Sequence, residues 1–188
     1  MSFDPAQVYQ PEADTFLLLA AAKDEVRPGD RVLEIGTGSG QIALELLRKC
    51  DIVATDINPH AVRCAQNNGI NVVRTDLCSG LKGSFDLILF NPPYLPTKPE
   101  ERINDWLEQA LDGGITGREV IERFAITIGR ILAPSGRILL LISSLTGVSP
   151  VIDLFATRGF KSEIVMRERV EDEELFVIKI VFDNSKHV

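Results

Sequence analysis

Short apolar runs alternate with segments of helical spacing along most of this chain. The clearest run is Phe85–Phe90 (FDLILF), which is typical of a strand buried on both faces of a parallel sheet. Similar runs predict strands at 31–35, 52–57, 71–76, 137–142, 161–169 and 175–182. The acidic residues 171–174 join the last two runs and predict a closing hairpin.

Helical patterns fill the gaps between the predicted strands. The leucine- and alanine-rich segment 16–22 favours a helix with Asp14 or Thr15 as the capping group in its first turn. Asn58 can cap a helix at 59–67. Further helices are predicted at 41–50, 103–111, 118–132 and 148–158. Strands that alternate with helices and end in two consecutive strands predict an α/β fold, with a mostly parallel sheet, one antiparallel strand and helices on both faces.

Length and charge narrow the class of protein. The 188 residues fit a single domain, 1–188. No apolar run approaches the ~20 residues that a bilayer span needs, and residues 1–12 lack a signal-peptide pattern, so we expect a cytoplasmic protein with no membrane contact. A formal charge of −7 argues against extensive nucleic-acid contact. Three separated cysteines and two distant histidines predict neither a disulfide framework nor a metal site.

Candidate chemistry gathers where the first four predicted strands end. The first strand ends in Glu34 and a glycine loop, and the second ends in Asp56. The third ends in Asp76-Leu77, and the fourth runs into Asn91-Pro92-Pro93-Tyr94. Because ligands of open α/β sheets bind outside the carboxyl ends of the strands, we expect these residues to share one site.

The glycine loop favours a nucleoside ligand over a dinucleotide. Gly36-Thr37-Gly38-Ser39-Gly40 has the spacing Gly-x-Gly-x-Gly, a partial match to the Gly-x-Gly-x-x-Gly of dinucleotide loops. Asp56 stands where an acid at the second strand end accepts hydrogen bonds from ribose hydroxyls. Alternatives stay open at the other acids. Glu34 can pair with Arg31 or a backbone amide, and Asp76 can cap a turn or accept from an adenine amino group.

The Asn-Pro-Pro-Tyr segment is the most informative of these strand ends. Pro92 restricts the backbone of Asn91, so the loop should be stiff. It can present the Asn91 side-chain oxygen and the Pro92 carbonyl as two acceptors, with the Tyr94 ring beside them, an arrangement that suits a planar NH2 group. The alternative is a proline-rich turn without chemistry. The long polar segment 97–117 that follows is of a kind that often covers a site.

Taken together, strand-Glu-x-Gly-x-Gly-x-Gly, the second-strand aspartate and Asn-Pro-Pro-Tyr resemble S-adenosylmethionine-dependent methyltransferases that act on amide or amino nitrogens. Two further motifs, Val8-Tyr9-x-Pro11 with 14–18 and Asp112-Gly113-Gly114 with 117–120, are similar to those of the short HemK-related glutamine N5-methyltransferases. Such enzymes of eukaryotes and archaea modify class-I translation release factors. The chain departs from them at Glu12-Ala13, which leaves Glu12 without an assigned role.

The resemblance implies a seven-stranded, Rossmann-like class I methyltransferase whose N-terminal segment 1–24 covers the cofactor site. Its activity would be methyl transfer from S-adenosyl-L-methionine to the glutamine amide nitrogen of a Gly-Gly-Gln segment. The implied cofactor-binding residues are Tyr9, Thr15, Glu34, Gly36, Gly38, Asp56, Ile57, Asp76, Leu77 and Asn91, and the implied catalytic residues are Asn91, Pro92, Pro93 and Tyr94. Tyr9 is equally compatible with a lid packed on the first helix, whereas Trp106 and Arg118 are taken as structural.

Other functions remain open at this point. A planar amide and a purine suit the same Tyr94 contact, so adenine-N6 methylation of DNA or RNA is an alternative, as is methylation of a protein lysine. A dinucleotide-dependent oxidoreductase or a non-catalytic nucleotide-binding module would share the fold. The resemblance also implies a partner, a small zinc-binding activator subunit, which we expect at the 71–76 edge strand because unpaired strands invite strand addition.

Overall fold

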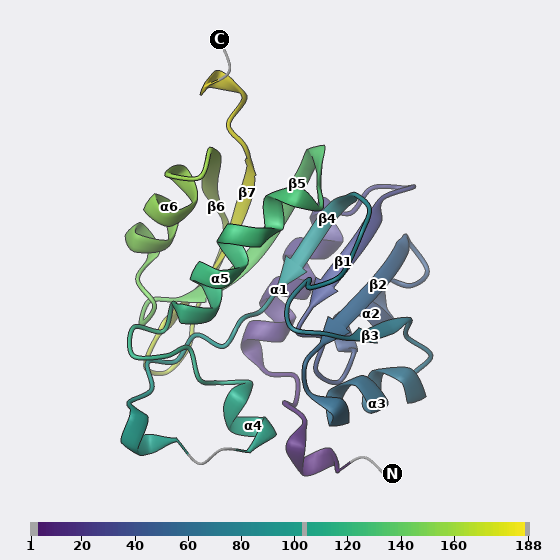
Figure 1. Ribbon diagram of the computed structural model, residues 1–188, viewed down its shortest axis with the longest axis vertical. Coiled ribbons are helices and arrows are strands. Elements are labelled where there is room, and N and C mark those ends of the chain that lie inside the picture. Colours follow the sequence, from purple (N-terminus) through teal and green to yellow (C-terminus); the bar gives the residue numbers. More distant parts are fainter. Residues whose placement is uncertain (1–3, 103–104, 187–188) are drawn as a thin grey trace.

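The computed structural model describes residues 4–102 and 105–186, and a seven-stranded sheet runs through the middle of them (Figure 1). The strands are β1 (Arg31–Ile35), β2 (Asp51–Asp56), β3 (Val72–Arg74), β4 (Phe85–Phe90), β5 (Leu132–Ser143), β6 (Phe160–Arg169) and β7 (Glu174–Phe182). Their order is β3-β2-β1-β4-β5-β7-β6. Strands β1 to β5 pair parallel with one another, and β7 pairs antiparallel with both β5 and β6. The predicted fold is therefore confirmed.

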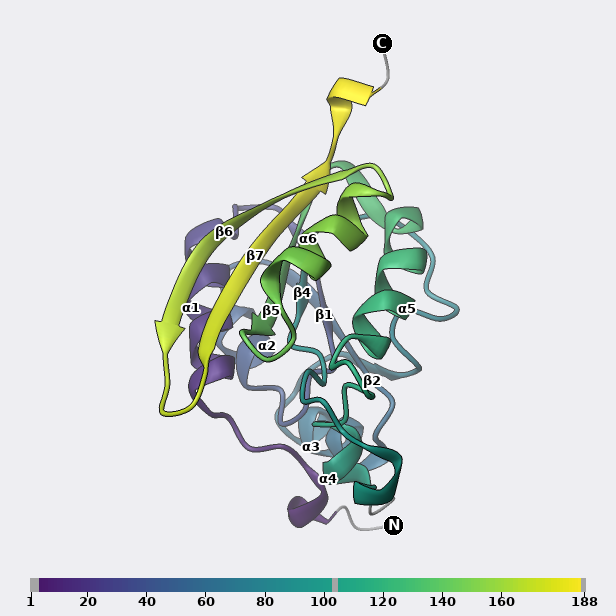
Figure 2. The ribbon, with the colours of Figure 1, turned by 90° about the vertical axis from the view of Figure 1, so that its left-hand side faces the viewer.

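Helices cover both faces of the sheet, and Figure 2 shows α1 on the opposite side of the strands from α5 and α6. One face packs against α1 (Ala13–Glu25), α2 (Gln41–Leu46) and α3 (Pro59–Asn67), and the other against α5 (Glu119–Thr127) and α6 (Val148–Ala156). The strand β4 shows why. Its successive side chains alternate between the two faces, so Leu87 and Leu89 join the α1–α3 side while Ile88 and Phe90 join the α5–α6 side.

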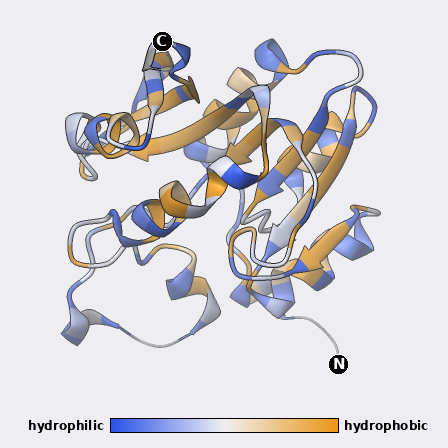
Figure 3. Cartoon of the chain, turned by 45° about the horizontal axis from the view of Figure 1, so that its top comes forward, coloured by the Kyte–Doolittle hydropathy of each residue, from blue (hydrophilic) through white to orange (hydrophobic). Residues whose placement is uncertain are grey.

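The hydrophobic colour in Figure 3 is concentrated in the strands. This agrees with the continuous apolar runs of the sequence, which a sheet covered on both faces requires. In the described part of the chain, no helix has the length and apolar composition needed to cross a membrane.

The position of α1 is fixed at its C-terminal end. Glu25, its last residue, pairs with Arg137 of β5 at 3.3 Å and with Lys179 of β7 at 2.8 Å. The Arg137 guanidinium is 3% exposed and also pairs with Asp30 at 2.6 Å. Loss of either partner would leave the buried Arg137 charge incompletely paired, which is costly. These ion pairs therefore fix the end of α1 against the sheet.

Several boundaries differ from those predicted. The turn signal Pro134-Ser135-Gly136 lies inside β5, where the pairing with β4 shifts between Phe85 and Leu87. Pro134 and Ser135 are exposed and Gly136 is buried, so the three residues form an irregular part of the strand and not a turn before it. The helix expected at 118–132 consequently ends at Thr127, with the 3-10 turn Ile128–Arg130 after it.

Three other elements are shorter than expected. The helix predicted at 41–50 ends at Leu46, and the strand predicted at 71–76 covers only Val72–Arg74. Of the helix predicted at 103–111, α4 forms Trp106–Gln109, and its first two positions lie outside the described residues. The edge position of β3 is as predicted.

Candidate active site

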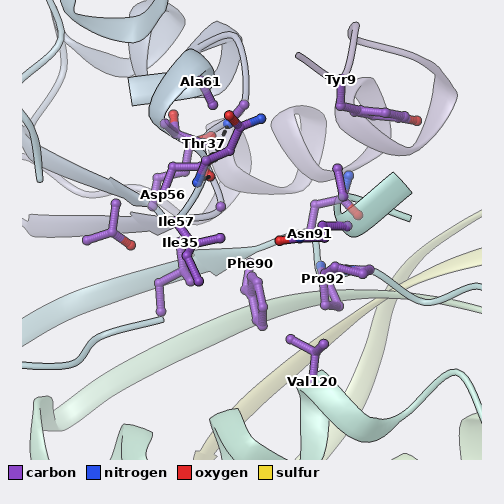
Figure 4. Close-up of a pocket in the computed structure, with 18 of the residues that line it drawn as sticks. Tyr9, Ile35, Thr37, Asp56, Ile57, Ala61, Phe90, Asn91, Pro92 and Val120 are labelled. Atoms are coloured by element: carbon purple, nitrogen blue, oxygen red, sulfur yellow. Dashed lines mark hydrogen bonds between the residues drawn. The ribbon is translucent and has the colours of Figure 1, made fainter. Parts of the chain in front are cut away.

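A cavity of about 300 Å³ opens at the carboxyl ends of the central strands. Strand register explains why the polar strand ends meet there, because Ile35 lies opposite Thr55 of β2 and Phe90 of β4. All of the predicted site residues line this cavity: Tyr9, Thr15, Glu34, Gly36, Gly38, Asp56, Ile57, Asp76, Leu77, Asn91, Pro92, Pro93 and Tyr94. In Figure 4, Tyr9, Asn91 and Pro92 lie on one side of the cavity and Thr37, Asp56 and Ile57 on the other.

Glu34 holds the glycine loop and the first turn of α2 through hydrogen bonds to its carboxyl group. Its Oε2 accepts hydrogen bonds from the Thr37 hydroxyl at 2.9 Å and from the Ala43 backbone amide at 3.0 Å. Of the two alternatives for Glu34, the structure shows the bond with a backbone amide and not the pairing with Arg31, whose guanidinium lies 5.4 Å from the centre of the Phe85 ring. Burial raises the pKa of Glu34 to about 8, against the lowering effect of the two hydrogen bonds.

Asp56 joins the ends of β2 and the glycine loop. Its two carboxylate oxygens accept separate backbone hydrogen bonds, from Gly38 N at 2.9 Å and from Asn58 N at 2.8 Å. Burial raises the pKa of Asp56, although these bonds favour its charged form. Each oxygen keeps lone-pair capacity for a further donor, which is what adjacent ribose hydroxyls need.

Leu77 carries backbone strain at the far end of the cavity. Its φ of 52° makes it the only non-glycine residue with a positive φ among those described, and its carbonyl accepts a hydrogen bond from the Thr55 hydroxyl at 2.9 Å. Such strain in a residue with a Cβ is often found at functional sites. Next to it, the Asp76 carboxylate pairs with Arg123 of α5 and does not cap a turn.

Asp14 is the residue that the sequence analysis missed. It does not cap α1, whose N-cap residue is Glu12 and has no side-chain cap. Its carboxylate Oδ2 instead accepts hydrogen bonds from Asn91 Nδ2 at 3.0 Å, from the Tyr9 hydroxyl at 3.0 Å and from the Tyr94 hydroxyl at 3.5 Å. A usable signal was its spacing, because i+3, i+4 and i+7 on the same helix face are the buried Leu17, Leu18 and Ala21.

The Asn91 side chain is held in one orientation by this contact. A carboxylate has no hydrogen to donate, so the amide must direct its NH2 group at Asp14. The opposite atom, Asn91 Oδ1, is buried and has no hydrogen-bond partner. An unpartnered buried acceptor is costly in a folded protein, and this one belongs to a residue that lines the cavity.

The two tyrosines beside Asn91 keep their protons. Burial together with the neighbouring Asp14 carboxylate raises the pKa values of both Tyr9 and Tyr94 well above the usual range. Neither hydroxyl can therefore act as a base near neutral pH.

A glycine turn from the 97–117 segment clamps the Asn-Pro-Pro-Tyr loop. Gly113 N donates to the Leu95 carbonyl at 2.9 Å, and Thr97 N donates to the Gly114 carbonyl at 2.9 Å. From the same segment, Trp106 lines the cavity, which its interpretation as purely structural did not anticipate. Arg118 donates a hydrogen bond to the Thr146 carbonyl, as a structural residue would.

Comparison with known proteins identifies the family. The family model described as the methyltransferase small domain matches residues 12–159. This chain belongs to the methyltransferase small domain family. Among the fold neighbours is E. cuniculi Mtq2, solved in complex with Trm112 and described as responsible for methylating the translation termination factor eRF1. Its TM-score is 0.79 and its identity is 30%, over 94% of this chain and 99% of the other.

Two sequence relatives support the same assignment. A protein of Methanocaldococcus jannaschii, provisionally named as a protein N5-glutamine methyltransferase, is 43% identical over 92% of this chain and 90% of its own length. The human methyltransferase HEMK2 is 34% identical over 93% of this chain and 89% of its own length. The family makes S-adenosylmethionine the cofactor, and the chain is a methyltransferase rather than an oxidoreductase or a non-catalytic nucleotide-binding module.

Proposed function

We propose that this chain transfers a methyl group from S-adenosyl-L-methionine to the side-chain amide nitrogen of the glutamine in a Gly-Gly-Gln segment of a class-I translation release factor. The names of the relatives support this substrate. The observation that carries it in the structure is the buried, unpartnered Asn91 Oδ1, on a residue that lines the cavity, where it would accept a hydrogen bond from an NH2 group. Such a substrate also places the reaction in the cytoplasm.

The residues of the cofactor half fit a nucleoside with a charged tail. Asp56 would accept hydrogen bonds from ribose hydroxyls, and the apolar Ile57 and Leu77 flank the place for a flat base. Gly36 and Gly38, with φ of 67° and 55°, keep the loop backbone in a conformation that residues with a Cβ rarely adopt. We assign cofactor binding to the predicted residues on these grounds.

Methylation of an amide is difficult because its nitrogen lone pair is delocalised into the carbonyl. Asn91 Oδ1 and the Pro92 carbonyl would accept hydrogen bonds from the two N–H groups of the substrate amide. These bonds would orient the nitrogen and stabilise the positive charge that develops on it. When bound, S-adenosylmethionine would supply an electrophilic methyl group, with the electron pair of the S–CH3 bond left on sulfur. Asn91 and Pro92 would hold the amide nitrogen toward that methyl group, and the nitrogen would give up one proton to water as it gains the methyl group. Pro93 and Tyr94 would pack against the planar amide.

We further propose that residues 1–188 act as one methyltransferase domain whose N-terminal segment 1–24 covers the cofactor site; residues 1–3 of that segment lie outside the described residues, as do 103–104 and 187–188. The support is that residues of this segment reach the cavity, among them Tyr9, Pro11, Thr15 and Leu18.

A partner subunit would bind at β3. This edge strand leaves backbone groups unpaired, and its Val73 side chain is 41% exposed. The fold neighbour Mtq2 was solved with the small protein Trm112. We propose that a small zinc-binding activator subunit adds to this edge and forms a heterodimer with the chain.

An assay with several methyl acceptors tests the proposed function. The chain, with and without the partner, is incubated with labelled S-adenosylmethionine and with a release factor, a lysine-rich protein, DNA or RNA. We expect label in the release factor alone. Label in nucleic acid would support adenine methylation, which the charge of −7 disfavours, and label in the lysine-rich protein would support lysine methylation; either result without release-factor labelling would refute the proposal.

A further inference from the structure

The Asp14 carboxylate accepts five hydrogen bonds in the described part of the chain. Besides Asn91, Tyr9 and Tyr94 on Oδ2, its Oδ1 accepts from the Thr15 backbone amide at 2.6 Å and from the Thr15 hydroxyl at 3.2 Å. The residue is 4% exposed and lines the cavity beside Asn91. A buried carboxylate is expensive to desolvate, and this set of donors offsets that cost.

These contacts determine which atoms of the neighbours remain for a substrate. Asn91 directs its NH2 group at Asp14, which leaves the buried Oδ1 as the unpartnered acceptor of a side chain that lines the cavity. The hydroxyls of Tyr9 and Tyr94 each have one hydrogen, and both hydrogens point to Asp14. Only lone pairs are left on their outward sides. This half of the cavity therefore presents hydrogen-bond acceptors and no side-chain donor from these three residues.

We propose that Asp14 is the positioning residue that sets this polarity, and that it thereby selects the amide nitrogen of the substrate glutamine over its carbonyl oxygen and over the carboxylate of a glutamate. Each hydrogen of an NH2 group can donate to one of these acceptors. An oxygen that has only lone pairs finds no hydrogen-bond donor among them. The proposal rests on the proposed function and explains how its nitrogen specificity arises.

The pattern also explains why an aspartate, rather than an asparagine, suits position 14. Both carboxylate oxygens accept hydrogen bonds, Oδ1 from Thr15 and Oδ2 from Asn91. An amide at this position would turn an NH2 group toward one of those donors. If it faced Asn91, the Asn91 amide would have to rotate, which would place an N–H group in the cavity where the acceptor should be.

The test compares wild type with Asp14→Asn, in the presence of the partner subunit if wild type needs it. Three quantities are measured: kcat and KM for a Gly-Gly-Gln release factor, the inhibition constant of the same release factor with Gly-Gly-Glu, and cofactor affinity by calorimetry. We expect Asp14→Asn to lower kcat by about 100-fold, the effect typical of removing one preorganised group. Cofactor affinity should stay within about twofold, and the preference for glutamine over glutamate should shrink by roughly tenfold or more.

A double variant distinguishes an effect on the hydrogen-bond direction between residues 14 and 91 from a general effect on packing around residue 14. In Asp14→Asn with Asn91→Asp, the new amide at position 14 can donate to the new carboxylate at position 91, whose other oxygen faces the cavity as an acceptor. We expect kcat to recover by about tenfold over Asp14→Asn alone. If Asp14→Asn does not fold, Tyr9→Phe serves instead, with an expected loss of about 3- to 10-fold in kcat and a smaller glutamine preference.

The outcomes distinguish the two proposals. A wild-type chain that does not methylate the release factor refutes the proposed function. If wild type is active, the role of Asp14 is refuted by an Asp14→Asn chain with wild-type kcat and glutamine preference. It is equally refuted by one that loses activity with the glutamine preference unchanged and without recovery in the double variant, because that is the behaviour of a merely structural residue.

Discussion

A Cβ atom on Gly117 would lie 2.4 Å from the carbonyl oxygen of Tyr94. The glycine turn at the end of the 97–117 segment therefore packs directly against the Asn-Pro-Pro-Tyr loop, and only a residue without a side chain allows the approach. The contact links a motif that looks like an ordinary turn to the position of the substrate-binding acceptors.

Gly117→Ala should lower activity far more than it lowers stability. Its φ of 69° costs an alanine roughly 1–2 kcal/mol, and the contact with Tyr94 additionally displaces the loop. Gly69→Ala is the matched control, because its φ is 79° but no atom lies within 4 Å of an added Cβ. Denaturant unfolding and kcat are measured for both variants. Equal activity in the two would show that the Gly117 contact does not position the loop.

Asn91→Ala should abolish most turnover while much of the cofactor binding persists, because Asn91 is one of several proposed cofactor contacts. The variant removes the acceptor Oδ1 and leaves the Asp14 carboxylate without one of its donors, so we expect kcat to fall by about 100-fold or more. Asn67→Ala, an exposed position at the end of α3 and outside the cavity, is the control. Methyl transfer and calorimetric binding are compared. Wild-type turnover in Asn91→Ala would contradict the assigned role.

Asp56→Asn should weaken cofactor binding. An amide at this position must turn an NH2 group toward Gly38 N or Asn58 N, both of which now donate to the carboxylate. Loss of hydrogen bonds to a charged acceptor predicts an increase in Kd of about 10- to 100-fold, measured by calorimetry. The exposed Asp153→Asn on α6 should bind as wild type. An unchanged Kd in Asp56→Asn would remove this residue from the cofactor site.

Glu34 should make the cofactor-free chain less stable as the pH rises. The folded chain holds this proton up to a pKa of about 8, whereas the unfolded chain releases it near 4.5, so between these values the unfolded state binds fewer protons. The contribution of Glu34 to the free energy of unfolding is fully present below pH 4.5. It falls by up to ~1.4 kcal/mol per pH unit between pH 4.5 and about pH 8. Denaturant unfolding of wild type and Glu34→Gln at pH 5, 6.5 and 8 measures the difference. Parallel pH dependences in the two chains would contradict the raised pKa.

Val73→Asp should weaken binding of the partner subunit without changing the cofactor site. The substitution places a charge on the β3 edge, where Val73 is 41% exposed, whereas Ile126→Asp places one on an apolar position of α5 that is 69% exposed. Association is measured by analytical ultracentrifugation, with cofactor affinity as a check on folding. Equal association of the two variants with the partner would locate the interface elsewhere.

Sequence patterns predicted the sheet and most of the site because each depends on local signals. Buried parallel strands are continuous apolar runs, and their polar ends, such as Glu34 and Asp56, meet by sheet geometry alone. The extent of β5 was mispredicted because Pro134 and Gly136 signal a turn whether or not a strand continues through them.

Asp14 shows the corresponding limit for the site. A short acidic residue at the beginning of a helix has a strong local explanation as a cap, and its true partners, Tyr9, Asn91 and Tyr94, are separated from it by up to 80 positions. Only the tertiary packing of α1 against the sheet brings these side chains together. The pairing of Asp76 with Arg123 is likewise a contact between segments 47 positions apart.

Site-resolved mass spectrometry of the methylated release factor is the most direct test of the central claim. The release factor is incubated with the chain, S-adenosylmethionine and the candidate partner, then digested and fragmented. We predict one added methyl group on the side-chain nitrogen of the Gly-Gly-Gln glutamine, and none when Asn91→Ala replaces wild type. A methyl group on another residue, or an unmodified glutamine beside methylated lysine or adenine in parallel reactions, would contradict the account.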